Sequence, residues 1–324
     1  MLSSSQHDIY AVTGITGKVG GALGRTLLAS NQCVRALARD AAKARGWAQL
    51  GCEVAVADMT DVAALTAAFS RAKGVFILPP SEFDPAPGFP HALAVIKAVK
   101  TALDTARPGK VVCLSTIGAQ AVQLNLLTQR TILERELSGL AMPVTFLRPA
   151  WFMENFAWDV AAARDSGVIA SFLQPLDKPV PMVASADVGR VAAELIQEDW
   201  RECRIVELEA AQRITPNQVA AAFARILGHD VRASAVPREN WHSLFKAQGM
   251  KHPLPRMQML DGFNQGWIEF EHGESGSRKG ELTLEAVLTG LIEADAEQRR
   301  ALTQRVSRRS RARSSTSIRR AGSA

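Results

Sequence analysis

The sequence predicts an α/β protein built on a doubly wound parallel sheet (a Rossmann-type fold), followed by a smaller α+β lobe. Three observations support this fold class. Six short apolar runs alternate with helical patterns in the first 150 residues. Each run is apolar at consecutive positions, as in strands that are covered on both faces. The first run leads directly into spaced glycines that open a helix, as in many sheets of this kind.

The expected strands lie at residues 9–12, 33–38, 53–57, 74–78, 110–114 and 144–147. The helices between them are expected at 22–29, 41–50, 61–72, 91–106 and 126–137. Ligands of such sheets bind at the carboxyl ends of the strands. The residues at these ends are Gly14, Arg39, Asp58, Pro79, Ser115 and Pro149.

After Pro149 the alternation loosens. Helical patterns occur at 151–164, 185–197, 215–227 and 282–292, with short extended runs at 180–183, 205–208 and 231–236. This half has little sheet of its own. We therefore expect residues 1–150 to form the sheet domain and 151–297 to form a substrate lobe partly interleaved with it.

Composition excludes several classes of protein. The chain of 324 residues is 47% hydrophobic, enough for a full core. We expect no membrane span, because no apolar run approaches the roughly 20 residues that one needs. The polar N-terminus lacks a signal sequence. Four distant cysteines and six scattered histidines show neither a disulfide framework nor metal-ligand spacing. We expect a cytoplasmic protein without a metal.

The net charge of +6 comes from the C-terminus. The last 27 residues contain nine arginines and no acidic residue. Subtracting these nine from the 38 basic residues leaves 29, against 32 acidic residues. We expect residues 298–324 to be a disordered tail, because they are nearly free of large apolar side chains. Such a tail is either solvated and functionless or makes weak contact with nucleic acid or another anionic surface.

The glycine-rich stretch after the first strand predicts a dinucleotide site. Gly14, Gly17 and Gly20 would give the tight turn, the close approach of a phosphate to the backbone, and close packing of helix on strand. Unpaired amides at the start of the helix, with its positive dipole end, receive the anion. A glycine-rich turn without a ligand is the alternative interpretation. The expected contacts here are Gly14, Thr16, Gly17, Lys18, Val19 and Gly20.

The end of the second strand indicates which dinucleotide binds. A carboxylate there holds the ribose 2′-hydroxyl of NAD, whereas an arginine accommodates the 2′-phosphate of NADP. This position is Arg39, with Lys18 and Lys43 expected nearby, so NADP is favoured and NAD remains an alternative. Arg39 could instead only pair with its neighbour Asp40. Asp58 either contacts the adenine edge or caps the following turn.

Several motifs resemble one known family. Thr13-Gly-Ile-Thr-Gly-Lys-Val-Gly20 is followed by matching segments at 34–39, 57–61 and 114–118 and by Phe146-Leu-Arg-Pro-Ala-Trp-Phe-Met-Glu-Asn155. Together they resemble an atypical short-chain dehydrogenase/reductase of the NmrA-like group, over roughly residues 8 to 295. The segments 76–80, 84–87 and 151–155 are similar to reductases of the festuclavine type and their bacterial relatives. The resemblance implies NAD(P)H binding and a reductase activity.

The usual acid of that superfamily is missing. Ordinary members use a tyrosine and a lysine four residues later, but the only tyrosine here is Tyr10, in the first strand. Leu126 and Arg130 occupy the two positions, and Ser115 keeps the accessory hydroxyl. Three explanations stay open: an easily reduced substrate that needs no protein acid, another group, or no chemistry at all. The candidates for another group are Ser115, Arg130, His91 and Glu154.

The resemblance and the strand ends together give the expected site. Ser115 and Arg130 are the catalytic candidates. Beyond the glycine loop, the cofactor is expected to contact Arg39, Asp58, Met59, Leu78, Pro79, Ser115, Thr116, Arg130 and Pro149. The substrate is expected to contact Phe83, Trp151, Phe152, Glu154 and Asn155. The aromatic residues could instead be ordinary core, and Glu154 and Asn155 could only fasten the lobe.

The favoured function is an NAD(P)H-dependent oxidoreductase that reduces an apolar, readily reduced small molecule such as a quinone, an imine or an azo compound. Its catalysis would consist mostly of positioning. The alternative is a non-catalytic sensor that binds the dinucleotide and reports redox state to a protein partner. The expected partners are a small-molecule substrate and either a second copy of the chain or a regulatory protein.

Overall fold

The computed structural model describes residues 8–320. Within these residues the centre is one eight-stranded sheet with the order β12-β10-β6-β5-β4-β1-β2-β3, and all its neighbouring strands are parallel. The strands are β1 (Ile9–Val12), β2 (Cys33–Ala38), β3 (Glu53–Val56), β4 (Ala72–Ile77), β5 (Val111–Leu114), β6 (Val144–Pro149), β10 (Arg204–Glu209) and β12 (Arg278–Lys279). The expected doubly wound parallel sheet is confirmed.

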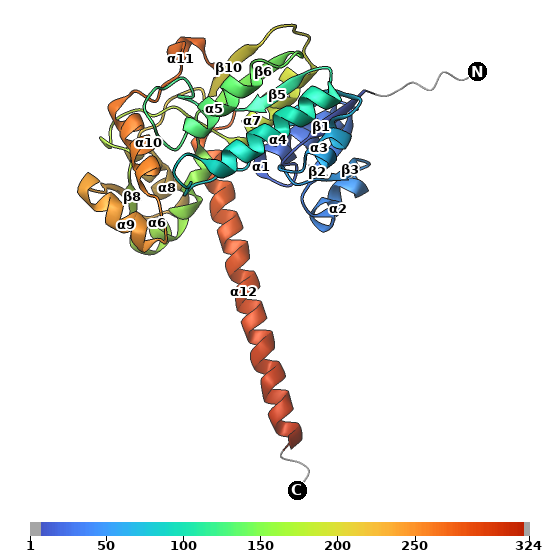
Figure 1. The fold of residues 1–324 in the computed structure, drawn as a ribbon. Coiled ribbons are helices and arrows are strands. Elements are labelled where there is room, and N and C mark those ends of the chain that lie inside the picture. Colours follow the sequence, from blue (N-terminus) through green and yellow to red (C-terminus); the bar gives the residue numbers. More distant parts are fainter. Residues whose placement is uncertain (1–7, 321–324) are drawn as a thin grey trace.

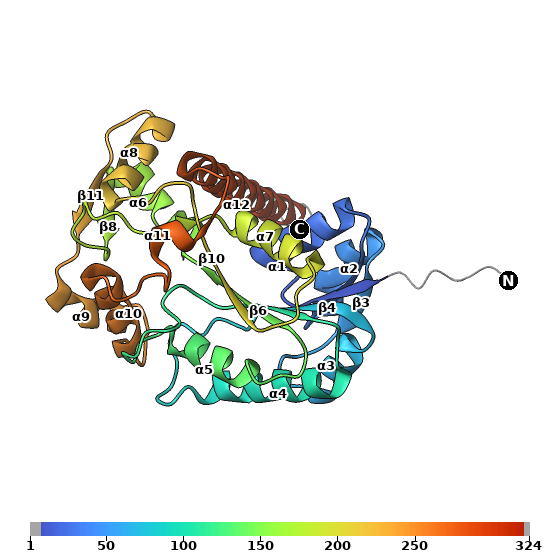
Figure 2. The same cartoon turned by 90° about the horizontal axis from the view of Figure 1, so that it is seen from above.

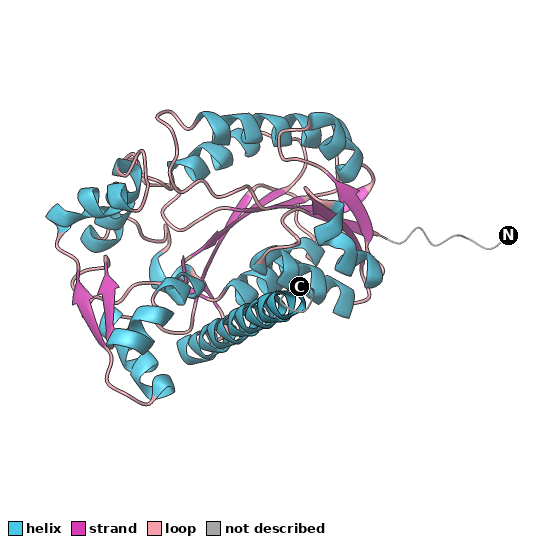
Figure 3. Ribbon diagram, turned by 90° about the horizontal axis from the view of Figure 1, so that it is seen from below, coloured by secondary structure: helices cyan, strands magenta, loops and turns pink. Residues whose placement is uncertain are grey.

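Helices cover both faces of the sheet, because every central strand is apolar on both sides (Figure 3). One face packs against α1 (Lys18–Ala29), α2 (Ala41–Gln49) and α7 (Ser185–Gln197). The other packs against α3 (Val62–Phe69), α4 (Pro90–Ala106) and α5 (Thr128–Leu137). Tyr10 and Val12 point to the first layer and Ala11 to the second.

The order of strands reverses between β1 and β4. The chain moves outward through β2 and β3, then crosses to β4 on the other side of β1. In open parallel sheets such a reversal leaves a crevice at the carboxyl ends of the two strands, where ligands bind. Here these ends are the glycine loop after Val12 and the segment after Ile77.

The chain returns to the sheet after entering the lobe. β10 lies beside β6, with Ile205 opposite Phe146, so the short run expected at 205–208 belongs to the main sheet. α7 packs closely on α1. A Cβ at Gly189 would lie 2.5 Å from the Ala22 Cβ and 2.5 Å from the Val19 carbonyl oxygen. Glycine is therefore what allows these two helices to approach.

The lobe lies at one end of the molecule, beyond the carboxyl ends of the strands (Figure 2). It pairs β7 with β9 and β8 with β11. Its elements are β7 (Trp151–Phe152), η1 (Met153–Trp158), α6 (Val160–Ser166), β8 (Val168–Ser171), β9 (Met182–Val183), α8 (Pro216–Leu227), β11 (Arg232–Ala235), η2 (Arg238–Asn240), α9 (Trp241–Ala247), α10 (Leu254–Gln265) and α11 (Gly273–Gly276). The helix expected at 151–164 is wrong at its start, because Trp151 donates its amide to Pro181 and extends into β7 (N···O 3.1 Å).

The last helix, α12 (Leu284–Arg320), corrects the expectation of a disordered tail for residues 298–320. Leu284 and Leu288 are buried in the core. Beyond them the helix extends away from the body of the protein (Figure 1). No glycine or proline interrupts residues 291–320, so a helix anchored by its first turns can continue. Residues 321–324 lie outside the described part.

Within residues 8–320 we find no helix that is both long and apolar enough to span a membrane.

Gly189→Ala should destabilise the protein by about 1–3 kcal/mol, because the added methyl overlaps α1. Gly290→Ala is the matched control, since nothing lies within 4 Å of a Cβ there. In that helix alanine should be neutral or stabilising by up to about 1 kcal/mol. Chemical denaturation measures both changes. Equal effects of the two substitutions would contradict the close contact between α1 and α7.

Asp159, between η1 and α6, should make stability depend on pH. Burial raises the pKa of its carboxyl to about 6, above the usual value of about 3.9 in an unfolded chain. The associated stabilisation is present below about pH 4 and is lost as pH rises through about 6. We expect Asp159→Asn to stabilise the protein more at pH 8 than at pH 5, by about 1 kcal/mol in unfolding free energy. A gain independent of pH would contradict this.

Candidate active site

The glycine loop after β1 is fixed to the end of β4. The Thr13 hydroxyl donates to the Phe76 carbonyl (3.0 Å) and accepts from the Leu78 amide (2.7 Å). Gly14 follows with φ +66°, a left-handed conformation that glycine adopts without strain. A Cβ at Gly14 would also lie 3.3 Å from the Leu78 side chain. The two strand ends that flank the crevice are therefore held together by Thr13 and Gly14.

Gly20 brings α1 against this loop. A Cβ there would lie 2.3 Å from the Gly14 carbonyl oxygen, so any other residue would push the helix away. The Gly17 amide donates to the Gly14 carbonyl (2.9 Å) and is used within the turn. The amides of Lys18, Val19 and Gly20 have no acceptor among the described residues, so the first turn of α1 presents the free donors.

Three cations lie at the end of β2 and in the first turns of α1 and α2. Lys18, Arg39 and Lys43 are all exposed, and none forms an ion pair with a described residue. The Asp40 carboxylate accepts from the Ala42 amide (2.8 Å) and caps α2. The alternative in which Arg39 is neutralised by Asp40 is therefore wrong. Arg39 keeps its donors free at the end of β2.

Asp58 caps a turn. Its Oδ1 accepts from the Thr60 amide (2.9 Å) and from the Thr60 hydroxyl (2.6 Å). These bonds, chiefly the one from the hydroxyl, lower the pKa of Asp58, and the charge of Arg39 adds to the effect. The turn-cap interpretation is thus confirmed, and the carboxylate also lies close enough to Arg39 to feel its charge. Met59 beside it is half-buried.

Ser115, at the end of β5, donates its hydroxyl hydrogen bond to Glu134. Its proton is therefore engaged, which disfavours the expected role as a donor to substrate. Arg130, one helical turn before Glu134, points elsewhere. Its Nη2 donates to the carbonyl oxygens of Pro79 (3.2 Å) and Pro80 (3.5 Å). Burial lowers the pKa of Arg130, and no carboxylate pairs with it among the described residues.

Glu134 belongs to a buried ionic network that the sequence analysis missed. Its two carboxylate oxygens accept from Nη2 (2.7 Å) and Nε (2.9 Å) of Arg148, at the end of β6. Arg148 also contacts Glu271 (2.7 Å) and Glu207 (3.7 Å). Burial by itself would lower the pKa of Arg148, but the hydrogen bonds and charges of Glu134 and Glu271 together outweigh it and raise that pKa. A charged residue at the end of an otherwise apolar strand was the available signal for such a network.

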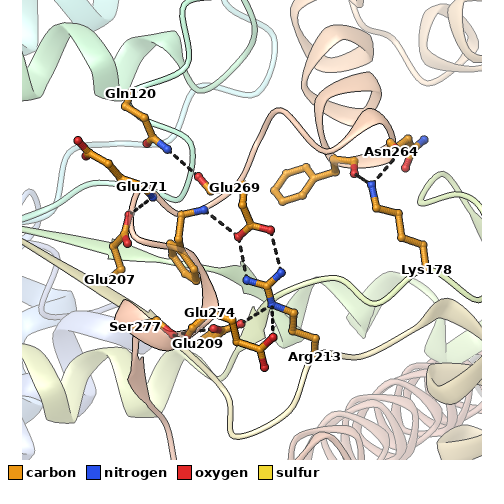
Figure 4. Close-up of polar contacts among 12 residues, drawn as sticks. Gln120, Lys178, Glu207, Glu209, Arg213, Asn264, Glu269, Glu271, Glu274 and Ser277 are labelled. Atoms are coloured by element: carbon orange, nitrogen blue, oxygen red, sulfur yellow. Dashed lines mark hydrogen bonds and ion pairs between the residues drawn. The ribbon is translucent and has the colours of Figure 1, made fainter.

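Two buried glutamates of β10 continue this network (Figure 4). Glu207 accepts from the amides of Glu271 (2.7 Å) and His272 (3.2 Å). Glu209 accepts from Ser277 (2.6 Å), Lys279 (2.8 Å) and Arg213 (3.0 Å). These bonds fasten residues 271–279 along the outer edge of the sheet. These contacts hold the carboxyl ends of β6 and β10 in place, so their charged residues stabilise the fold.

The loop after β4 is tied to the lobe. Asp84 accepts from the amides of Lys251 and His252, both at 2.6 Å. Leu126 donates its amide to Pro255, at the start of α10 (2.9 Å). Phe83 remains 59% exposed beside this clamp. The segments following β4 and β5 therefore meet α10, and the loop that carries Phe83 is held at Asp84 in this structure.

The segment after β6 places the other expected substrate residues. Trp151 and Phe152 are half-buried, and Trp151 packs edge-on against Phe263 of α10 (ring centroids 5.2 Å apart). The Trp151 indole N–H is buried without an acceptor. Both oxygens of Glu154 accept from the Ser185 amide (2.8 and 3.0 Å), so Glu154 caps α7 and fastens the lobe. Asn155 is exposed.

Other expected residues lie as follows. Thr16 is exposed and Thr116 half-buried, while Pro79 and Pro149 are buried and His91 is exposed. Two surface hollows, of about 310 and 520 Å³, lie elsewhere, beside β10 and along α12. The structure therefore gathers the glycine loop, Arg39, Asp58, Pro79, Ser115, Arg130 and Trp151 at one edge of the sheet, and it gives Ser115 and Glu154 structural partners.

Two known oxidoreductases are similar to this chain in sequence. The chain is 28% identical over 247 residues to an NAD(P)H azoreductase of Xenophilus azovorans, covering 75% of this chain and 82% of the relative. It is 28% identical over 253 residues to quinone oxidoreductase 2 of Escherichia coli, covering 77% and 85%.

Solved structures give the same result. An NADPH-dependent quinone oxidoreductase of Escherichia coli in complex with NADPH superposes with a TM-score of 0.74 at 24% identity, covering 87% of this chain and 99% of that one. A Citrobacter triphenylmethane reductase in complex with NADP(H) gives 0.70 at 21%, covering 86% and 98%. The model of the NmrA-like family matches residues 6–276. This chain belongs to the NmrA-like family.

Proposed function

We propose that this protein is an NAD(P)H-dependent reductase of apolar, readily reduced small molecules, with NADPH as the preferred cofactor. The observation that carries the proposal is the first turn of α1. Its amides have no acceptor among the described residues, and the exposed cations Lys18, Arg39 and Lys43 form no ion pair with a described carboxylate. The named relatives reduce azo compounds and quinones, which supports the same class of substrate.

The residues present fit a dinucleotide. The amides of Lys18, Val19 and Gly20 would hold the diphosphate at the positive end of α1. Arg39, with Lys18 and Lys43, would hold a 2′-phosphate. The adenine would lie against Asp58 and Met59. The rest of the cofactor would follow the strand ends at Leu78, Pro79, Ser115, Thr116 and Pro149.

When bound, the nicotinamide supplies a hydride. Reduction of a quinone to a hydroquinone takes that hydride and one proton, and water can provide the proton because the product oxyanion is a weak base. This chain then needs no tyrosine. Its residues hold the cofactor and the substrate in position for hydride transfer and exclude other arrangements of the two. Arg130 keeps its charge and would stabilise negative charge that develops on the substrate.

The substrate wall would be Phe83, Trp151 and Phe152. The unsatisfied Trp151 N–H adds one donor to an otherwise apolar surface, and a buried donor without an acceptor is uncommon enough to suggest a ligand or water. Glu154 would act only by fixing the position of α7. Asn155 would contact the substrate from the surface.

A non-catalytic redox sensor is the second candidate. The engaged hydroxyl of Ser115 and the missing tyrosine–lysine pair favour it. Such a sensor would signal through a protein partner, and a catalytic form could act alone or as a homodimer. We place either form in the cytoplasm. We also propose a sheet domain of residues 1–150 and a substrate lobe of 151–297, with any contact to nucleic acid confined to the basic C-terminal segment.

Turnover separates the two candidates. With a panel of quinones, iminium compounds and azo dyes, we expect the protein to oxidise NADPH with at least one of them, because positioning alone suffices for such acceptors. Absorbance at the NADPH band measures the rate. Tight binding of NADPH without oxidation in the presence of any acceptor would favour the sensor.

Arg39 tests the choice of cofactor. Arg39→Ala should weaken NADPH binding by about tenfold or more, because a charge-assisted contact with the 2′-phosphate is lost, and should change NADH binding much less. Fluorescence titration measures both affinities. Arg201→Ala is the control for net charge, since Arg201 is exposed just before β10, at the amino end of the sheet. Equal loss for NADPH and NADH at Arg39 would refute the phosphate role.

A further inference from the structure

Two partly buried arginines have no carboxylate partner among the described residues. Eight described arginines among residues 8–301 are at least partly buried. Six of them pair with Asp or Glu, namely Arg35, Arg148, Arg164, Arg190, Arg204 and Arg213. The other two are Arg130 and Arg256. Arg130 already has a proposed role toward charge that develops on the substrate, whereas Arg256 has no role in the proposed site.

Arg256, on α10, lies among rings and a thioether. Its guanidinium carbon is 4.5 Å from the centre of the Phe245 ring and 5.7 Å from that of Trp158. Nη1 points to the sulfur of Met250 at 3.8 Å, a weak acceptor. Burial lowers the pKa of Arg256, and no charged group opposes this effect. The protein therefore buries a cation here without providing an anion.

Another arginine of the same lobe shows what is missing. Arg238 stacks on Trp241 with 5.1 Å between the guanidinium carbon and the ring centre. Its edge is filled by Asp261, through two hydrogen bonds of 2.7 Å. A guanidinium that stacks by its face keeps its edge free for such a planar anion. Arg256 has the stacking and lacks the anion.

Arg256 is carried by α10, the helix whose Phe263 packs on Trp151 of the candidate site. The carbonyl of the preceding residue, Pro255, accepts from the amide of Leu126, so the start of α10 touches the segment between β5 and α5. Trp158 comes from η1, which follows β6, and is 74% exposed. In Figure 2 α10 lies beside the end of α5 that faces the lobe. Most of the Trp158 ring is exposed next to the Arg256 guanidinium, where an aromatic ligand could stack.

We propose that Arg256 binds an anionic substituent, a sulfonate or carboxylate, of the aromatic substrate that is reduced at the strand ends. The inference rests on the proposed function and specifies its substrate class. Two oxygens of such a group match the fork of the guanidinium, and the exposed Trp158 ring provides a stacking surface for the aromatic part. Neutral substrates would leave the charge of Arg256 unmatched.

The test compares 1,4-naphthoquinone-2-sulfonate with 1,4-naphthoquinone. We measure kcat/KM with NADPH for the wild type, Arg256→Gln and Arg256→Lys. Arg256→Gln should lower the ratio of the sulfonated to the neutral quinone by about tenfold or more, and Arg256→Lys should restore part of it. Arg238→Gln, the matched stacked arginine, should leave the ratio as in the wild type. An unchanged ratio in Arg256→Gln would overturn the inference.

A binding measurement distinguishes failure of this inference from failure of the proposed function. If neither quinone is reduced, calorimetric titration with naphthalene-2-sulfonate, which is not reducible under these conditions, decides about Arg256 alone. Weaker binding by Arg256→Gln than by the wild type supports the anion site, and equal binding rejects it. If the glutamine variant does not fold, Arg256→Met keeps an aliphatic stem against Phe245 and is compared with the wild type in the same assays.

Discussion

The buried guanidinium of Arg148 is the interaction on which the carboxyl edge of the sheet depends. It lies at the end of β6 and contacts carboxylates from α5, β10 and the segment before α11. Removing one partner of such a network costs about 3–5 kcal/mol, because the remaining charge is left buried and uncompensated. The same network reaches Ser115 through Glu134. Ser115, which the resemblance to the family suggested as an accessory hydroxyl, is here hydrogen-bonded into the scaffold.

This arrangement suits chemistry that needs placement more than proton transfer. The first turn of α1 offers free amides, and Gly20 holds the helix close enough for them to face the crevice. After β6, the lobe contributes rings and a buried indole N–H. Hydride transfer to an easily reduced acceptor requires little else from the protein. The structure therefore reconciles a reductase fold with the missing tyrosine.

Among the described residues, arginines of the scaffold differ in their partners from those near the candidate site and on α10. Where an arginine serves the scaffold, as Arg148 and Arg213 do, the chain supplies carboxylates from several elements. Arg39 and Arg130, near the strand ends, and Arg256, on α10, form no ion pair with a described carboxylate. Unmatched cations cost free energy in a protein without a ligand. The partly buried Arg130 and Arg256 carry this cost, which an anionic ligand would offset.

The sequence by itself determined the sheet, the turn and the missing acid. Apolar runs and the glycine spacing depend on local chemistry, so β1 to β6 and the loop at Gly14 could be read directly. Only the tertiary structure decided what Ser115, Asp40 and Glu154 bind, because their partners come from other elements or compete within a turn. It also placed β10 beside β6 and turned the C-terminal segment into a helix, since strand pairing and anchoring by Leu284 and Leu288 are not local properties. Only the tertiary structure likewise decided that Arg256 has no carboxylate partner, because this can be seen only once every neighbour of the side chain is in place.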